Sequence, residues 1–159
     1  MKTAIIYYSY EGNSVLVADL LKNELDAEIF EIKTVDTKKR KGFSLILWGA
    51  FQVMGNKKPE LRSLPIDINA FDLIILGTPV WVGSPAPAMV SFLNQTKITG
   101  KKLALFCCHG GGMGKIFDKV KALLTENEII SEIDFKYPAK AGRDELKGKI
   151  CDWAKTLRA

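Results

Sequence analysis

The twelve residues TAIIYYSYEGNS, at positions 3–14, join an apolar segment directly to a predicted helix that begins near Asn13. The apolar part, Thr3–Tyr8, has the composition of a buried strand. The connection SYEGNS supplies two hydroxyl groups, a glycine that permits close backbone approach, and the free amide groups of a helix N-terminus. Because the helix dipole also favours negative charge there, the junction predicts a phosphate site. A turn with a helix N-cap and no ligand is the alternative.

Length and composition indicate one domain of ordinary size. The chain has 159 residues, of which 47% are hydrophobic and 26% are charged, values typical of globular domains. No stretch reaches the roughly 18 apolar residues that a membrane span requires. Met1 and Lys2 lead straight into the first strand, without the pattern of a secretory signal. We therefore expect a single domain over residues 1–159, located in the cytoplasm.

The distribution of charge and the positions of the cysteines argue against nucleic-acid binding and against a metal site. The formal net charge is +5, and the densest basic run is Lys38–Lys41. A solvated loop or a site for an acidic protein partner explains this run, whereas no aromatic interleaving or motif indicates nucleic-acid binding. Cys107 and Cys108 are adjacent strand residues that point to opposite faces, and Cys151 lies far along the chain. We therefore expect buried thiols and no metal site.

Strand-like and helix-like segments alternate along the whole chain. The predicted strands are Thr3–Tyr8, Glu28–Ile32, Leu73–Gly77, Leu103–Cys108 and a weaker one at Ile129–Phe135. The predicted helices are Ser14–Glu24, Pro85–Asn94, Lys115–Thr125 and Arg143–Leu157. This pattern predicts an α/β fold, a doubly wound five-stranded parallel sheet with helices on both faces. The second and fifth strands are less apolar than the others, so we place them at the edges.

Three loops follow the first, third and fourth strands and therefore meet at the carboxyl edge of the sheet, where such folds bind ligands. The loop Thr78–Ser84 presents Trp81 on a short, restrained segment, a placement suited to stacking on a flat ring. Packing of Trp81 onto the core is the alternative. Ser84 and Pro85 are expected to be the N-cap and the first residue of the next helix.

The third loop lies in FCCHGGGMGK (Phe106–Lys115) and matches neither of two nucleotide-binding motifs that it resembles. A Walker A loop would need glycine in place of His109 and a hydroxyl residue in place of Ile116. A dinucleotide fingerprint would need glycine at position 115 and would follow the first strand. The four glycines instead let the backbone approach a ligand closely, or they form a flexible turn without one.

Together, the three loops resemble those of the flavodoxin-like family of FMN-binding proteins. TPVW (Thr78–Trp81) is especially like the small flavodoxin-type proteins of anaerobic microbes. The resemblance implies strand order 2-1-3-4-5 and FMN as the cofactor, with its phosphate on the first loop and its ring between the other two. The implied cofactor-binding residues are Ser9, Tyr10, Glu11, Gly12, Asn13, Ser14, Thr78, Pro79, Val80, Trp81, Val82, Gly83, Cys108, His109, Gly110, Gly111 and Gly112. No catalytic side chain is assigned, because the cofactor carries the chemistry.

Two features depart from the family's pattern. Glu11 stands where the family usually has a hydroxyl residue, so we expect its carboxylate to point away from the phosphate. Carrier flavodoxins are usually acidic and stack a tyrosine from the loop after the fourth strand, whereas this chain is basic with glycines there. The preferred function is an electron carrier that serves a redox partner protein. The alternatives are an NAD(P)H-dependent flavin or quinone oxidoreductase and a binding module that has lost flavin.

The connection after the second strand holds an apolar insertion at about residues 38–60. Its segment GFSLILWGAFQVMGN (Gly42–Asn56) carries no charged residue. The apolar positions surround too much of a helix for one buried face. We weigh a helix that covers the core, a contact in a homodimer, a hydrophobic roof over the flavin, and attachment to a membrane surface beside Lys38–Lys41.

Overall fold

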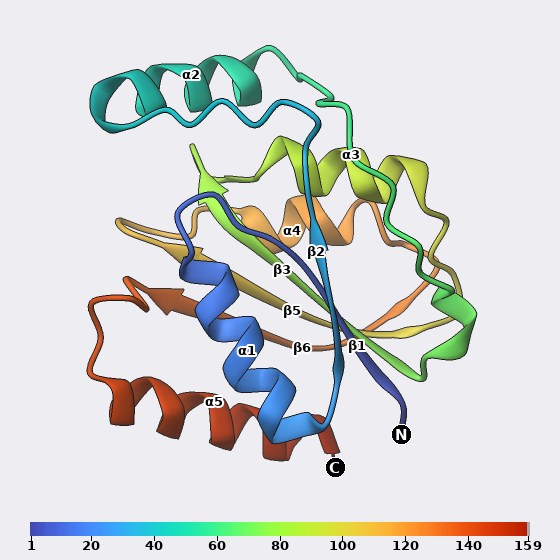
Figure 1. Cartoon of the computed structure of the whole chain (residues 1–159). Coiled ribbons are helices and arrows are strands. Elements are labelled where there is room, and N and C mark those ends of the chain that lie inside the picture. Colours follow the sequence, from blue (N-terminus) through green and yellow to red (C-terminus); the bar gives the residue numbers. More distant parts are fainter. Residues whose placement is uncertain (159) are drawn as a thin grey trace.

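The computed structural model describes residues 1–158, and its elements follow the predicted alternation of strands and helices (Figure 1). The strands are β1 (Thr3–Tyr8), β2 (Glu28–Ile32), β3 (Leu73–Trp81), β4 (Ser84–Pro85), β5 (Lys102–His109) and β6 (Glu128–Lys136). The helices are α1 (Asn13–Leu25), α2 (Gly42–Met54), the 3-10 helix η1 (Ile68–Ala70), α3 (Pro87–Gln95), α4 (Ile116–Lys121) and α5 (Arg143–Arg158).

The sheet has the strand order β2-β1-β3-β5-β6, and all of these neighbours run parallel. The two-residue strand β4 pairs only with β3, in the antiparallel sense. With β4 set aside, this is the predicted order 2-1-3-4-5, and the less apolar second and fifth strands lie at the edges. The carboxyl ends of β1, β3 and β5 therefore meet at the centre of one edge.

Two hydrophobic cores lie on opposite faces of the sheet. In Figure 1, α1 and α5 cover one face, and α3 and α4 cover the other. Ile5 packs in the core that includes Val17 of α1, whereas its neighbour Ile6 packs in the core that includes Met89 of α3. Because successive strand residues point to opposite faces, both must be apolar. This explains why the central strands show no alternation of apolar and polar residues.

The start of α3 differs from the prediction. Ser84 and Pro85 form β4, so the prediction that they are the N-cap and first residue of the helix is wrong. The N-cap is Ala86 and the helix begins at Pro87. The Ala86 N–H donates a hydrogen bond to Thr78 Oγ1 over 3.1 Å. The local preference of Ser-Pro for a helix start is overridden by strand pairing.

Strand β3 extends to Trp81, four residues beyond its predicted end at Gly77, because it forms a tight hairpin with β4. Val80 and Trp81 pair with the two residues of β4, and the turn between them is Val82–Gly83. Both turn residues have positive φ values, 51° and 64°, as a two-residue hairpin turn requires. Trp81 is therefore held at the end of a strand rather than on a free loop.

Helix α2 lies apart from both helical layers, above the carboxyl edge of the sheet (Figure 1). Gly49 is its only buried residue. A Cβ atom on Gly49 would lie 3.7 Å from the indole of Trp81, so the helix backbone passes close to that ring. Among residues 1–158, no helix has both the length and the apolar character needed to cross a bilayer.

Candidate functional site

A cavity of about 300 Å³ opens at the carboxyl edge of the sheet, between α2 and the ends of β1, β3 and β5. It is lined by Ser9, Tyr10, Glu11, Asn13, Ser14, Leu45, Ile46, Gly49, Ala50, Pro79, Val80, Trp81, Val82, Cys108, His109, Gly110 and Tyr137. All three loops singled out in the sequence contribute to it. The cavity therefore lies where a doubly wound sheet places its ligands.

Five of the predicted binding residues do not line this cavity. They are Gly12, Thr78, Gly83, Gly111 and Gly112. Thr78 is buried and holds the start of α3, whereas Gly83 forms the hairpin turn. Gly111 and Gly112 are exposed. A direct role of these five residues in binding stays a prediction.

The N-terminus of α1 is free of side-chain caps, as an anion site requires. Gly12 is the N-cap, with a φ of 97°, and no side chain caps the helix. The Gly12 N–H donates to Ser9 Oγ over 3.1 Å, which shapes the loop before the helix. Nothing lies within 4 Å of the position that a Cβ on Gly12 would occupy. The first amide groups of α1 have no acceptor within the helix and can therefore bind an anion.

Ser14 supplies a buried hydroxyl group at the same point. The residue is 1% exposed, and its Oγ has no hydrogen-bond partner in the described structure. It lies beside the Cys108 thiol, which is only a weak hydrogen-bonding group. A buried hydroxyl without a partner costs about 1–3 kcal/mol. A ligand oxygen in the cavity would remove that cost.

Two other polar side chains of the first loop, Asn13 and Glu11, lie at the rim of the cavity. Asn13 Oδ1 accepts a hydrogen bond from the Ala139 N–H over 3.2 Å, which ties α1 to the segment before α5. Glu11 lines the cavity but is exposed. Water therefore screens its negative charge from an anion at the helix N-terminus.

Trp81 and Tyr10 line the cavity and belong to a cluster of four packed rings, which we call the aromatic wall; the other two, Tyr8 and Trp48, do not line this cavity. Its ring centroid lies 6.2 Å from that of Tyr8, 5.8 Å from that of Tyr10 and 5.4 Å from that of Trp48, all in edge-on geometry. Trp81 is half-buried: it packs against the core below α3 and α4 and also lines the cavity. Burial raises the pKa of Tyr8 to about 12, so this ring is neutral. The three edge-on contacts hold the indole of Trp81 in a position where it still lines the cavity.

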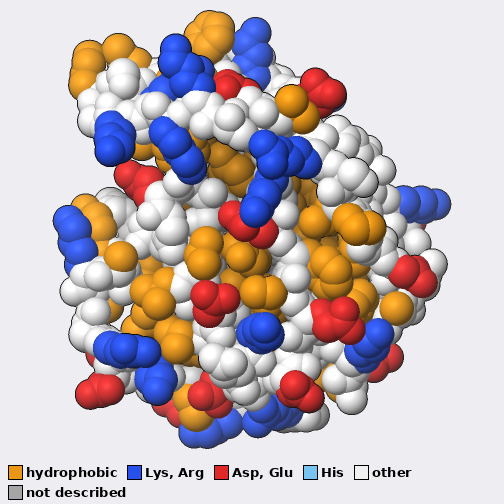
Figure 2. Space-filling view, in the orientation of Figure 1, with side chains coloured by type: hydrophobic (Ala, Val, Ile, Leu, Met, Phe, Trp, Pro, Cys, Tyr) orange, Lys and Arg blue, Asp and Glu red, His pale blue; other side chains and the backbone are white. Residues whose placement is uncertain are grey.

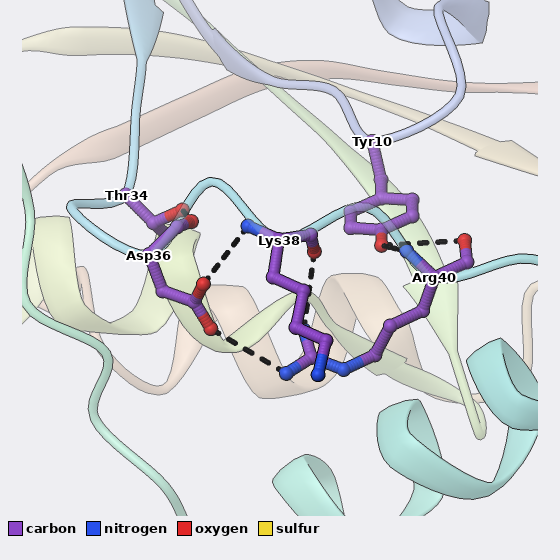
Figure 3. Close-up of polar contacts among 5 residues, drawn as sticks. All are labelled: Tyr10, Thr34, Asp36, Lys38 and Arg40. Atoms are coloured by element: carbon purple, nitrogen blue, oxygen red, sulfur yellow. Dashed lines mark hydrogen bonds and ion pairs between the residues drawn. The ribbon is translucent and has the colours of Figure 1, made fainter.

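The segment before α2 holds Tyr10 in place (Figure 3). The Arg40 N–H donates to the Tyr10 hydroxyl over 2.6 Å. The Asp36 carboxylate accepts the Lys38 N–H over 2.9 Å and pairs with Arg40 at 3.6 Å. The Lys38 N–H, helped by Arg40, lowers the pKa of Asp36. The Arg40 guanidinium in turn lies 4.3 Å from the centre of the Trp48 ring, so the basic run is partly built into the aromatic wall.

The third loop brings His109 and Gly110 to the other side of the cavity. His109 Nε2 lies 2.9 Å from Asp134 Oδ2 on β6. This hydrogen bond lowers the pKa of Asp134 below its ordinary value. A Cβ atom on Gly110 would lie 2.8 Å from the ring of Tyr137, so glycine is required for that ring to approach.

Sequence reasoning missed Tyr137 as a cavity residue. It follows β6, is 45% exposed and has a φ of 45°. It reaches the cavity only because β5 and β6 are neighbours, and its N–H donates to the His109 carbonyl over 2.8 Å. An aromatic ring thus lies beside the glycine loop, although it comes from the connection after β6. No local sequence signal could have revealed this contact.

Four residues of α2 were also absent from the predicted site. Leu45, Ile46, Gly49 and Ala50 line the cavity. This geometry corresponds to the hydrophobic roof, one of four interpretations of the apolar insertion. The absence of charge over Gly42–Asn56 was the only signal in the sequence.

Cys107 and Cys108 are buried, as the sequence predicts, whereas Cys151 is only partly buried. Cys107 packs in the core below α3 and α4, and Cys108 packs in the opposite core. Burial raises the pKa of both thiols to about 12, so neither is a nucleophile at neutral pH. No cluster of three potential metal ligands is found within the described part of the chain.

The model of the NADPH-dependent FMN reductase family matches residues 1–129. The chain belongs to this family. Over 84% of its length it is similar to the flavoprotein from Lactobacillus acidophilus NCFM, solved in complex with FMN, with 29% identity and a TM-score of 0.74. That match covers 92% of the Lactobacillus chain. The prediction of a flavodoxin-like, FMN-binding family is thus confirmed.

Two further proteins are similar to this chain. The flavodoxin of Streptococcus pneumoniae TIGR4 is 17% identical over 99% of this chain and 98% of its own, with a TM-score of 0.63, which supports the fold alone. The NAD(P)H dehydrogenase (quinone) of Gluconacetobacter diazotrophicus is 32% identical over 106 residues. This match covers 60% of the present chain and 53% of the relative, so the chain spans about half the length of that curated protein.

Proposed function

We propose that the chain binds FMN in the cavity at the carboxyl edge of the sheet and acts as an electron-transfer flavoprotein. The observation that carries this proposal is the uncapped N-terminus of α1, with the unpartnered hydroxyl of Ser14 beside it. A phosphate group satisfies both at once. The family match supports FMN as the molecule that brings the phosphate.

The chain's own residues would bind and shield the cofactor. The first amides of α1 would hold the phosphate, while Trp81 and Tyr137 would flank the ring. Leu45 and Ile46 of α2 would exclude water from its exposed side. When bound, FMN supplies the one- and two-electron redox chemistry, so no side chain is needed as a nucleophile or general base.

The charge of the whole chain favours particular electron partners. With 23 Lys and Arg against 18 Asp and Glu, the protein has a formal net charge of +5. A positive field attracts anionic ligands and speeds encounters with acidic proteins. An acidic redox partner protein of the cytoplasm is therefore the expected physiological partner of an electron carrier.

A second candidate function is the reduction of flavin or a quinone by NAD(P)H. A second cavity, of about 480 Å³, lies beside the first and shares Tyr10 and Trp81 with it. Its basic lining residues are Lys38, Arg40, Lys57 and Lys58. Aromatic rings next to basic side chains suit a co-substrate that carries both a ring and phosphates. The quinone-reducing relative supports this alternative.

One experiment distinguishes the two functions. The purified chain is loaded with FMN, freed of excess flavin, and reduced stepwise without oxygen while its absorbance is recorded. A carrier is expected to accumulate a one-electron reduced form and to oxidise NAD(P)H slowly, with or without a quinone. Steady NAD(P)H oxidation with a quinone supports the reductase. Failure to retain FMN would contradict both functions and support a module that has lost flavin.

A further inference from the structure

Helix α2 carries an apolar stripe on its outer side. The exposed fractions are 72% for Phe43, 67% for Ile46, 56% for Leu47, 61% for Phe51 and 78% for Met54. These positions recur at spacings of one, three and four residues, which places them along one side of a helix. We call these five residues the α2 stripe.

The opposite side of α2 already makes the contacts that hold the helix to the body of the protein. Trp48 packs on Trp81 with ring centroids 5.4 Å apart, and Gly49 faces the same indole. A helix attached in this way normally turns polar side chains to water. Here the outward side is apolar, and a contiguous exposed apolar patch indicates an interaction surface.

Basic residues flank the α2 stripe at both ends. Lys38, Lys39, Arg40 and Lys41 precede the helix, and Lys57 and Lys58 follow it. The nearby carboxylate of Asp36 is paired with Arg40. In Figure 2, orange apolar side chains lie at the top and the left end of the ridge that α2 forms, with blue basic and a few red acidic side chains among and below them. The surface therefore fits a partner that is apolar inside and negatively charged at its boundary.

We propose that the α2 stripe inserts into the surface of an anionic lipid membrane, while the basic flanks bind the lipid headgroups. A helix with aromatic and aliphatic residues on one side and basic residues at the polar boundary is suited to the interface of a bilayer. Lipids also adapt to a convex ridge such as α2, which protrudes from the body (Figure 1). Each basic residue near an anionic surface strengthens binding by roughly fivefold.

A second copy of the chain explains the same surface less well. An isologous dimer through residues 42–56 would bring the basic flanks of two protomers together, and like charges repel. The 13-residue helix offers a stripe only about 20 Å long. Such a stripe alone falls short of the roughly 800 Å² per partner that a stable complex buries.

Membrane docking would also position the cavity. Ile46 belongs to the α2 stripe and lines the cavity below it. Docking would therefore hold the mouth of the cavity at the lipid surface, within reach of an acceptor dissolved in the bilayer. The docking proposal itself does not depend on bound flavin, so it is tested separately from the proposed function.

The test is flotation of the whole chain with lipid vesicles. Phosphatidylcholine vesicles with phosphatidylglycerol are expected to carry the protein, and vesicles of phosphatidylcholine alone are expected to leave it behind. Raising the salt concentration should weaken binding, because salt screens the headgroup charge. Equal recovery with both vesicle types, or recovery with neither, would overturn the proposal.

Two pairs of variants separate the apolar and basic contributions. Phe43→Ser with Met54→Ser should abolish flotation, whereas Ile130→Ser, exposed at 36% on β6, should not change it. Lys38→Gln with Lys41→Gln should weaken binding by at least about tenfold, and Lys22→Gln with Lys147→Gln should leave it unchanged. Circular dichroism checks that each variant is folded. A stable dimer that the Phe43 and Met54 changes dissociate would assign the stripe to self-association and overturn the proposal.

Discussion

Ser14 shows most clearly how one residue links burial to function. Its hydroxyl is fully buried, has no partner and lies at the uncapped start of α1. Burying such a group without a hydrogen bond destabilises the fold. The proposed contact with a phosphate oxygen would supply the missing hydrogen bond.

Replacing Ser14 by alanine should weaken FMN binding without harming the fold. We expect roughly tenfold lower affinity, the worth of one hydrogen bond, with an unchanged or slightly higher melting temperature. Flavin titration and thermal unfolding measure the two effects. Ser91→Ala is the matched control, because Ser91 is the other buried hydroxyl without a partner and lies on α3, outside the cavity. Equal losses of affinity in both variants would argue against a phosphate contact at Ser14.

Asp134 predicts a specific dependence of stability on pH. The hydrogen bond from His109, with support from Lys149, lowers the pKa of this carboxyl in the folded protein below its ordinary value of 3.8. A lowered folded pKa stabilises the protein above pH 4, and this contribution disappears as the pH falls through the folded value. The carboxylate is 42% exposed, so the contribution is below about 1 kcal/mol.

The variant Asp134→Asn should therefore unfold at a lower temperature than the native chain at pH 7. The difference between the two melting temperatures should shrink as the pH falls below 4, and it should vanish once the pH lies below the lowered pKa of Asp134, where both side chains are neutral. Thermal unfolding at several pH values measures it. A difference that stays constant across this range would mean that the charge of Asp134 does not stabilise the fold.

A side chain of the central strand β5 fills the space beside a glycine of its neighbour β3, so that glycine cannot carry a side chain. Gly77 of β3 is the pairing partner of Phe106 on β5. A methyl group at Gly77 would overlap the ring of Phe106. Phe106 precedes the third loop on β5, so its contact with Gly77 also helps to position that loop.

Gly77→Ala should destabilise the protein by about 1–3 kcal/mol, the usual cost of overpacking a core. Gly148→Ala is the control, because Gly148 lies exposed on α5 with nothing near its missing Cβ. That change should stabilise the helix by about 0.5–1 kcal/mol. Denaturant unfolding measures both free energies. If Gly77→Ala proved neutral, the close approach of Phe106 would be incorrect.

The sequence predicted strand bounds that depend on local residue patterns, and it missed features that depend on contacts between distant segments. The bounds of β1 and β2 agree with prediction, because short apolar runs between turn signals leave little choice. The start of α3 was missed because the hairpin of β3 and β4 captured Ser84 and Pro85. Tyr137 was missed because its contact with Gly110 joins loops 27 positions apart in the chain.

Helix α2 marks the limit of sequence reasoning for a different reason. An uncharged segment predicts burial, yet most of its large apolar side chains face water in the isolated chain. Four interpretations of the segment remained open, because the periodicity of one helix does not reveal which side meets the body. The structure shows that Trp48 and Gly49 face the body, whereas the α2 stripe faces outward.

The whole molecule divides its tasks between a rigid sheet and the loops at one edge. Two cores, one on each face, hold the carboxyl ends of β1, β3 and β5 together. The proposed phosphate site, the aromatic wall and the roof of α2 all lie at that edge. The central claim is that this edge binds FMN through its phosphate at the start of α1.

The most direct test compares FMN with riboflavin, which has the same ring but lacks the phosphate. The chain is titrated with each flavin while the fluorescence of Trp81 and its neighbours is followed. Several charge-assisted hydrogen bonds to the phosphate should make FMN bind at least about a hundredfold more tightly than riboflavin. Equal affinity for the two flavins, or no binding of either, would contradict the account.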